Sequence, residues 1–155
     1  MRKHLGHIFL QVLVLFVVSC NEIWGDHSLG NNLSLLEGDK TEDRIIVYCS
    51  GRSWGTCFTG IAVIPVYNRQ YDSSGHYAEF VETAKSNRKW VIVKTYQIQE
   101  EKENYWIISK NFNLANIDCS KANCDSILQS HVKGPMTQIE FRNKVRLLNI
   151  GLDFK

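Results

Sequence analysis

The sequence predicts an α+β fold, an antiparallel β-meander of about five to six strands with a C-terminal helix packed on it. Two observations lead to this prediction. Between residues 33 and 109, β-branched and aromatic runs of strand length alternate with turn-forming residues. Near the C-terminus, a helix-capping pattern precedes apolar residues at helical spacing. Strands in series with hairpin-length connections favour an antiparallel sheet over a parallel one.

The first half of this region supplies three predicted strands. A short strand at Leu33–Leu36 ends at a turn over residues 37–40, and the β-branched run Arg44–Cys49 gives the second strand. Residues 57–67 give the third strand, in which Pro65 cannot donate a ladder hydrogen bond. Pro65 therefore predicts that this strand lies at an edge or is bulged there.

Residues 77–86, which follow a predicted turn at 72–75, fit two kinds of element. Helical spacing relates four of their apolar side chains, Tyr77, Phe80, Val81 and Ala84. The Phe-Val pair and Thr83 favour a strand instead, and residues 86–89 look like a hairpin loop. We expect a strand, because the β-branched and aromatic run Trp90–Ile98 comes next. The last strong strand is expected at Tyr105–Ser109.

The C-terminal helix is predicted over residues 138–149. Thr137 and Glu140 form a capping box, in which each side chain accepts a hydrogen bond from the backbone N–H of the other residue. The predicted apolar stripe that follows consists of Ile139, Phe141, Val145 and Leu148. Gly151 marks the end of the helix, and Gly134-Pro135 predicts a turn that leads into it.

The N-terminus has the anatomy of a secretory leader. A basic start precedes an apolar run at Ile8–Val18, which as a helix rises only about 16 Å and is too short to span a bilayer. Val17-Val18-Ser19-Cys20 resembles the lipobox of bacterial lipoproteins, which implies cleavage before Cys20 and acylation of its thiol. Asn21 weakly favours export to the outer membrane. A plain secretory leader cut at another bond is the alternative.

This resemblance implies three segments. Residues 1–19 are the expected lipoprotein signal peptide, 20–32 a flexible tether with two glycines, and 33–155 a single β-rich domain. The formal net charge of +2 belongs to the leader, because Arg2 and Lys3 supply it. A formally neutral domain argues against nucleic acid or an anionic membrane surface as the main partner.

Four cysteines remain besides Cys20. In an oxidising compartment they predict two disulfides, of which we favour the local pairs Cys49–Cys57 and Cys119–Cys124, since each pair encloses turn-forming residues. Two other pairings, and free buried thiols, stay open. A zinc site is disfavoured, because the spacings within the two pairs are not those of zinc knuckles and no histidine lies near either pair.

Candidate catalytic residues lack a supporting pattern. The sequence has no nucleophile-elbow or phosphate-loop motif. His27, His76 and His131 fall in the predicted tether or in turns and are expected to be solvated. The acidic residues that could pair as general acid and base are expected to be surface charges; these are Glu79 with Glu82, and Glu100 with Glu101 and Glu103. We therefore predict no enzyme activity, no cofactor and no metal.

Arg52 and Trp54 are the candidate binding residues. Both lie in the loop that the Cys49–Cys57 pair encloses, where residues 50–55 are expected to form a turn. Tryptophan and arginine dominate the hot spots of protein interfaces, so a braced loop that displays both predicts a protein-binding surface. A Trp54 side chain folded back onto the sheet is the alternative.

Two stretches resemble a family of small, uncharacterised bacterial lipoproteins. These are Tyr105-Trp106-Ile107-Ile108-Ser109-Lys110, and Gly134-Pro135-Met136-Thr137-Gln138-Ile139-Glu140-Phe141, which opens the terminal helix. Met136 replaces the usual Leu, and the region of Cys119 and Cys124 looks like an insertion. The resemblance carries no catalytic residues. It implies a non-enzymatic envelope lipoprotein that binds a protein, with an immunity or inhibitor role as the most concrete form and a structural or accessory subunit of an outer-membrane assembly as the alternative.

Overall fold

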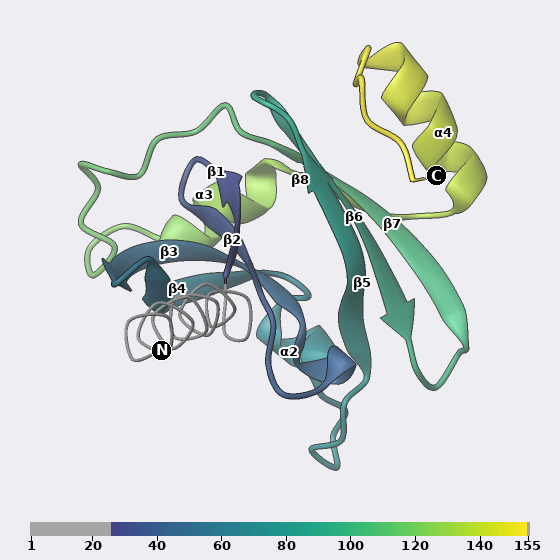
Figure 1. Cartoon of the computed structure of the whole chain (residues 1–155), viewed down its shortest axis with the longest axis horizontal. Coiled ribbons are helices and arrows are strands. Elements are labelled where there is room, and N and C mark those ends of the chain that lie inside the picture. The colour runs from purple at the N-terminus through teal and green to yellow at the C-terminus, as the bar shows by residue number, and fades with distance from the viewer. Residues whose placement is uncertain (1–25, 155) are drawn as a thin grey trace, which may run out of the picture.

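A computed structural model describes residues 26–154 as two antiparallel four-stranded sheets. The first sheet has the order β1 (His27–Gly30), β2 (Leu33–Leu36), β3 (Ile45–Ser53), β4 (Thr56–Ile64). The second has the order β5 (Glu79–Ser86), β6 (Trp90–Gln97), β7 (Lys102–Ser109), β8 (Val132–Met136). Figure 1 shows the second sheet between the first sheet and the C-terminal helix α4 (Gln138–Leu147).

The prediction of α+β structure is confirmed, but the single meander of five to six strands is wrong. Each sheet is a meander of consecutive strands, and the polypeptide passes from the first sheet to the second between β4 and β5. The intervening residues contain the short helix α2 (Tyr67–Gln70) and the predicted turn, in which Asp72 Oδ1 accepts from the backbone N–H groups of Ser74 and His76. Pro65 directly follows β4, an edge strand as expected.

The first sheet begins earlier than predicted, since residues 27–30 of the expected tether form β1. Leu29 is buried in the core, whereas a tether in solvent would leave this side chain exposed. Asn31 and Asn32 have φ values of 52° and 60° and make the tight turn from β1 to β2. Asparagine tolerates this left-handed conformation, so Gly30-Asn31-Asn32 is a hairpin turn rather than a flexible linker.

The second sheet confirms the strand prediction for residues 77–86. β5 pairs with β6 along its whole length, with one register shift between Val81 and Thr83. The sheet also gains β8, which the sequence did not predict. Gly134 and Pro135 lie inside this edge strand and are not a turn before the helix.

Side chains from both sheets form one core. The first sheet contributes Leu33, Ile46, Tyr48 and Ile64, and the second contributes Val81, Val93, Trp106 and Ile108. Two further short helices border the sheets, the 3-10 helix η2 (Thr41–Asp43) and α3 (Cys124–Ser130). Leu128 of α3 is buried in the same core. Within residues 26–154, no helix has the length and apolar character needed to cross a membrane.

The predicted helix α4 packs on the other face of the second sheet. Thr137 and Glu140 form the expected capping box. Phe141 is buried against Tyr105, with ring centroids 5.2 Å apart, and Phe154 covers both rings. Val145 and Leu148 join this second cluster as predicted, whereas Ile139 is 74 % exposed and does not belong to the buried stripe.

The hydroxyl of Tyr105 makes the stability of the folded protein depend on pH. Burial, with the 2.5 Å hydrogen bond from its hydroxyl to Glu103 Oε2, raises the pKa of Tyr105 from 10.0 to about 12. The unfolded protein therefore releases this proton at lower pH than the folded protein. Tyr105 thus contributes stability that is fully present below pH ~10 and is lost as the pH rises towards ~12.

We therefore expect alkaline pH to weaken the wild type more than the variant Tyr105→Phe. Between pH 9 and pH 11, urea unfolding should show a loss of unfolding free energy that is about 1 kcal/mol larger in the wild type. Equal losses in the two proteins would contradict this role for the hydroxyl.

Candidate interaction sites

The β3–β4 hairpin carries the most exposed aromatic side chains of the first sheet. Its tip consists of Trp54 and Gly55, which have φ values of 54° and 86°. The predicted turn over residues 50–55 is wrong in extent, because β3 continues to Ser53. The Trp54 side chain is fully exposed at 102 %, and Phe58 on β4 is 75 % exposed. Two large aromatic side chains thus project from one hairpin into solvent.

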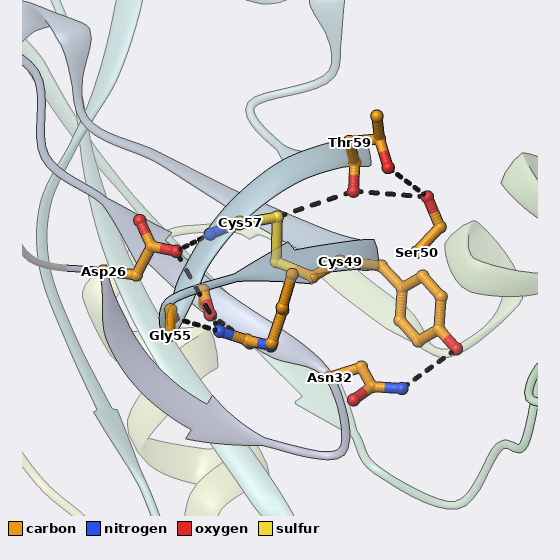
Figure 2. The surroundings of a disulfide bond; sticks show 10 residues. Asp26, Asn32, Cys49, Ser50, Gly55, Cys57 and Thr59 are labelled. Carbon is orange, nitrogen blue, oxygen red and sulfur yellow. Dashed lines mark hydrogen bonds and ion pairs between the residues drawn. A yellow bond between two sulfur atoms is a disulfide. The ribbon is translucent and has the colours of Figure 1, made fainter.

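The Cys49–Cys57 disulfide braces this hairpin, as Figure 2 shows. The Cα atoms of the two cysteines are 5.6 Å apart, and those of the second disulfide, Cys119–Cys124, are 5.4 Å apart. Both favoured local pairings are confirmed. The Asp26 carboxylate lies close to both sulfur atoms of the first pair, but sulfur in a disulfide is not the thiolate that a metal requires.

Arg52 is exposed, but groups of the domain hold its guanidinium. Its guanidinium donates to Ser34 Oγ at 2.6 Å and to the Gly55 carbonyl at 3.1 Å, and it lies 3.9 Å from Asp26 Oδ2. Asp26 in turn accepts from the Cys57 N–H (Figure 2). Arg52 therefore holds the hairpin against β2, and the Asp26 carboxylate partly compensates its charge.

The structure thus separates the two predicted binding residues. Both residues are exposed, but Arg52 is held by partners within the domain, whereas Trp54 projects freely, and the alternative of a Trp54 side chain folded onto the sheet is wrong. Phe58 was not predicted as a binding residue. Strand alternation was the available signal, because the Cys57 side chain turns to the disulfide and its neighbour Phe58 must point to the opposite side.

The remaining predicted residues do not gather into a site. Cys20 lies outside the described residues. His27 and His76 have side chains that are 66 % and 80 % exposed, and His131 packs near Phe112 at the end of α3. Glu100, Glu101 and Glu103 are exposed as expected.

Glu79 contradicts the prediction of a solvated charge, because it is only 1 % exposed. Its Oε2 accepts from Arg69 Nε at 2.7 Å, and its Oε1 accepts from Thr95 Oγ1 at 2.5 Å. Trp106 Nε1 donates to the same Thr95 oxygen at 2.9 Å. Four side chains from α2, β5, β6 and β7 therefore form a continuous polar network that is buried except at Arg69.

This network borders an open cavity of about 420 Å³. The lining combines charged side chains with the amides of Asn68, Gln97 and Asn104. Thr95 and Arg69 already occupy both oxygens of Glu79, which leaves this carboxylate poorly placed to act as a general base. The side-chain amides of the lining offer hydrogen-bond donors and acceptors to a ligand.

Comparisons with models of protein families, with curated proteins and with solved structures found no match to this protein. The resemblance to small bacterial lipoproteins therefore stays a prediction from residues 105–110 and 134–141.

Proposed function

We propose that this protein is an envelope-anchored lipoprotein that acts as a non-enzymatic protein-binding module. In this proposal Cys20 carries the lipid, the domain stands at the outer membrane of a bacterial cell, and the β3–β4 hairpin binds the partner. An immunity or inhibitor protein is the most concrete form of the role.

The full exposure of Trp54 on a braced hairpin is the observation that supports this proposal. A tryptophan gains little from contact with water and much from burial in a partner's pocket. The disulfide and the hydrogen bonds of Arg52 restrict the hairpin before any partner arrives. A restricted hairpin loses less conformational entropy on binding, which favours affinity.

The test removes the indole and measures binding and stability separately. Trp54→Ala in the full-length protein should lower cross-linking of a partner in intact cells by at least about tenfold, as loss of a hot-spot residue does. The melting temperature should stay within about 2 °C, because the side chain is not buried. Tyr67→Ala is a matched control, since Tyr67 is also exposed, at 76 %, but belongs to α2.

Two outcomes would count against the hairpin as the binding element. Unchanged cross-linking by Trp54→Ala would place the partner elsewhere, and loss of membrane association alone would assign the hairpin to the lipid surface.

The anchor has its own test, the intact mass of protein extracted from membranes. We expect the mass of residues 20–155 plus acyl groups, and the mass of an unacylated protein would refute the lipoprotein.

A further inference from the structure

Arg69 is oriented by two contacts that leave the end of its side chain unused. Its Nε donates to Glu79 Oε2 at 2.7 Å, and its guanidinium carbon lies 5.1 Å from the ring centroid of Trp106. Among residues 26–154, neither terminal nitrogen of Arg69 makes a hydrogen bond. An arginine held through Nε keeps its two terminal NH₂ groups as a fork that matches a carboxylate.

The groups behind Arg69 are themselves fixed. Trp106 donates to Thr95, and Thr95 donates to Glu79, so the carboxylate that holds Arg69 has a defined position. Glu79 is 1 % exposed, whereas the Arg69 side chain is 33 % exposed. The network therefore ends at the surface in one positioned guanidinium, which is an arrangement suited to binding rather than to packing alone.

The cavity that Arg69 lines has the size of a ligand site and a polar lining. Its volume of about 420 Å³ lies within the range of small-molecule pockets. Lys102 adds a second positive charge, but Asp72, Glu79 and Glu100 also line the cavity. The lining therefore has a formal charge of −1, which disfavours a doubly charged phosphate more than a singly charged carboxylate. A carboxylate would be held by the Arg69 fork and not by the net charge of the cavity.

The amide side chains of the cavity suit a peptide group next to such a carboxylate. Asn68, Gln97 and Asn104 line the same cavity, and within the described part of the chain the Asn104 side chain makes one hydrogen bond, a long one of 3.4 Å to Gln97. Side-chain amides both donate and accept, as peptide groups require. A carboxylate on the arginine fork would therefore have hydrogen-bonding partners beside it for an adjoining peptide unit.

We propose that this cavity binds the carboxylate of a peptide, with Arg69 as its main contact. The site is separate from the Trp54 hairpin and does not depend on the proposed function. The carboxylate can come from the C-terminus of a peptide or from an Asp or Glu side chain, and the test separates these two sources.

The test titrates four probes into the full-length protein in detergent and follows the side-chain Arg and Asn signals by NMR. The probes are acetyl-Ala-Ala-Ala with a free carboxylate, the same peptide amidated, acetyl-Ala-Asp-Ala-amide, and inorganic phosphate. We expect saturable shifts of the Arg69 Nε signal with at least one carboxylate peptide, at a Kd of about 1 mM, and none with the amidated peptide. The responding peptide identifies the source.

Two variants and one control assign the binding to Arg69. Arg69→Lys keeps the charge beside Glu79 but loses the fork, and should weaken binding at least about tenfold. Asn68→Asp adds a negative charge at an exposed position of the cavity and should weaken binding about two- to fivefold without loss of folding. Arg88→Lys, in the exposed β5–β6 connection, should change nothing.

Three results would overturn the proposal. The first is the absence of saturable shifts with both carboxylate peptides up to about 20 mM. The second is equal binding of the amidated peptide, and the third is tighter binding of phosphate than of either carboxylate. Binding that Arg69→Lys leaves unchanged would likewise show attraction by charge alone, without the arginine fork.

Discussion

Replacing Gly134 by alanine should destabilise the domain by about 3 kcal/mol or more. A Cβ at this position in β8 would lie 2.6 Å from Trp106 Cε3 and 2.8 Å from the Tyr105 carbonyl oxygen. Both neighbours are held in the sheet and cannot move away cheaply. In addition, Gly134 has a φ of 141°, a region that is nearly exclusive to glycine. Urea unfolding measures the loss, and the melting temperature should fall by about 10 °C or more.

Gly151→Ala is the matched control for this substitution. A Cβ at Gly151 meets no atom within 4 Å, and its φ is not in the positive region. We expect a change within about 0.5 kcal/mol, as for other surface positions. A similar cost for both variants would show that the close approach of β8 to Trp106 is not what constrains Gly134.

Removing the positive charge beside Glu79 should destabilise the domain almost as much as Gly134→Ala does. Arg69→Met keeps much of the side-chain volume over the Trp106 ring but leaves a carboxylate that is 1 % exposed without its ionic partner. An unpartnered buried charge typically costs about 3–5 kcal/mol. Because Arg69 is itself 33 % exposed, we expect the lower end of that range, measured as unfolding free energy in urea.

The double variant Arg69→Met/Glu79→Leu separates charge from packing. It removes both charges and should recover most of the stability, since apolar replacement of a buried ion pair is often neutral or favourable. Lys121→Met is the exposed counterpart, because Lys121 and Asp118 are 84 % and 54 % exposed. It should cost less than about 1 kcal/mol. If the double variant is no more stable than Arg69→Met, the burial of the Glu79 charge is not the cause.

The strands that the sequence predicts are those with a strong local pattern. The β-branched runs at Ile45–Ser53 and Trp90–Gln97 form strands because such side chains suit a pleated, half-buried surface. β8 has no such pattern, since its Val-Lys-Gly-Pro-Met sequence becomes a strand only through pairing with β7. The division into two sheets is equally non-local. The two sheets form because the consecutive strands β4 and β5 do not pair, and the spacing of residues in the sequence does not indicate this.

The candidate site residues show the same contrast between local and non-local determinants. Local sequence was enough for the two disulfides, because short loops rich in turn residues favour local pairing. It was not enough for Glu79. The partners of Glu79 lie 10 and 16 residues away on other elements, so the burial of its charge depends on tertiary structure. One signal was available, since strand alternation places Glu79 on the same side as the buried Val81.

The hydrogen bond from the Cys57 N–H to Asp26 fixes where the polypeptide enters the domain. With a lipid on Cys20, the segment between the anchor and Asp26 can extend by no more than about 20 Å. The β3–β4 hairpin would then work within a shallow zone above the bilayer. A partner that binds Trp54 would then meet it close to the membrane surface, whether that partner moves along the membrane or arrives from solution.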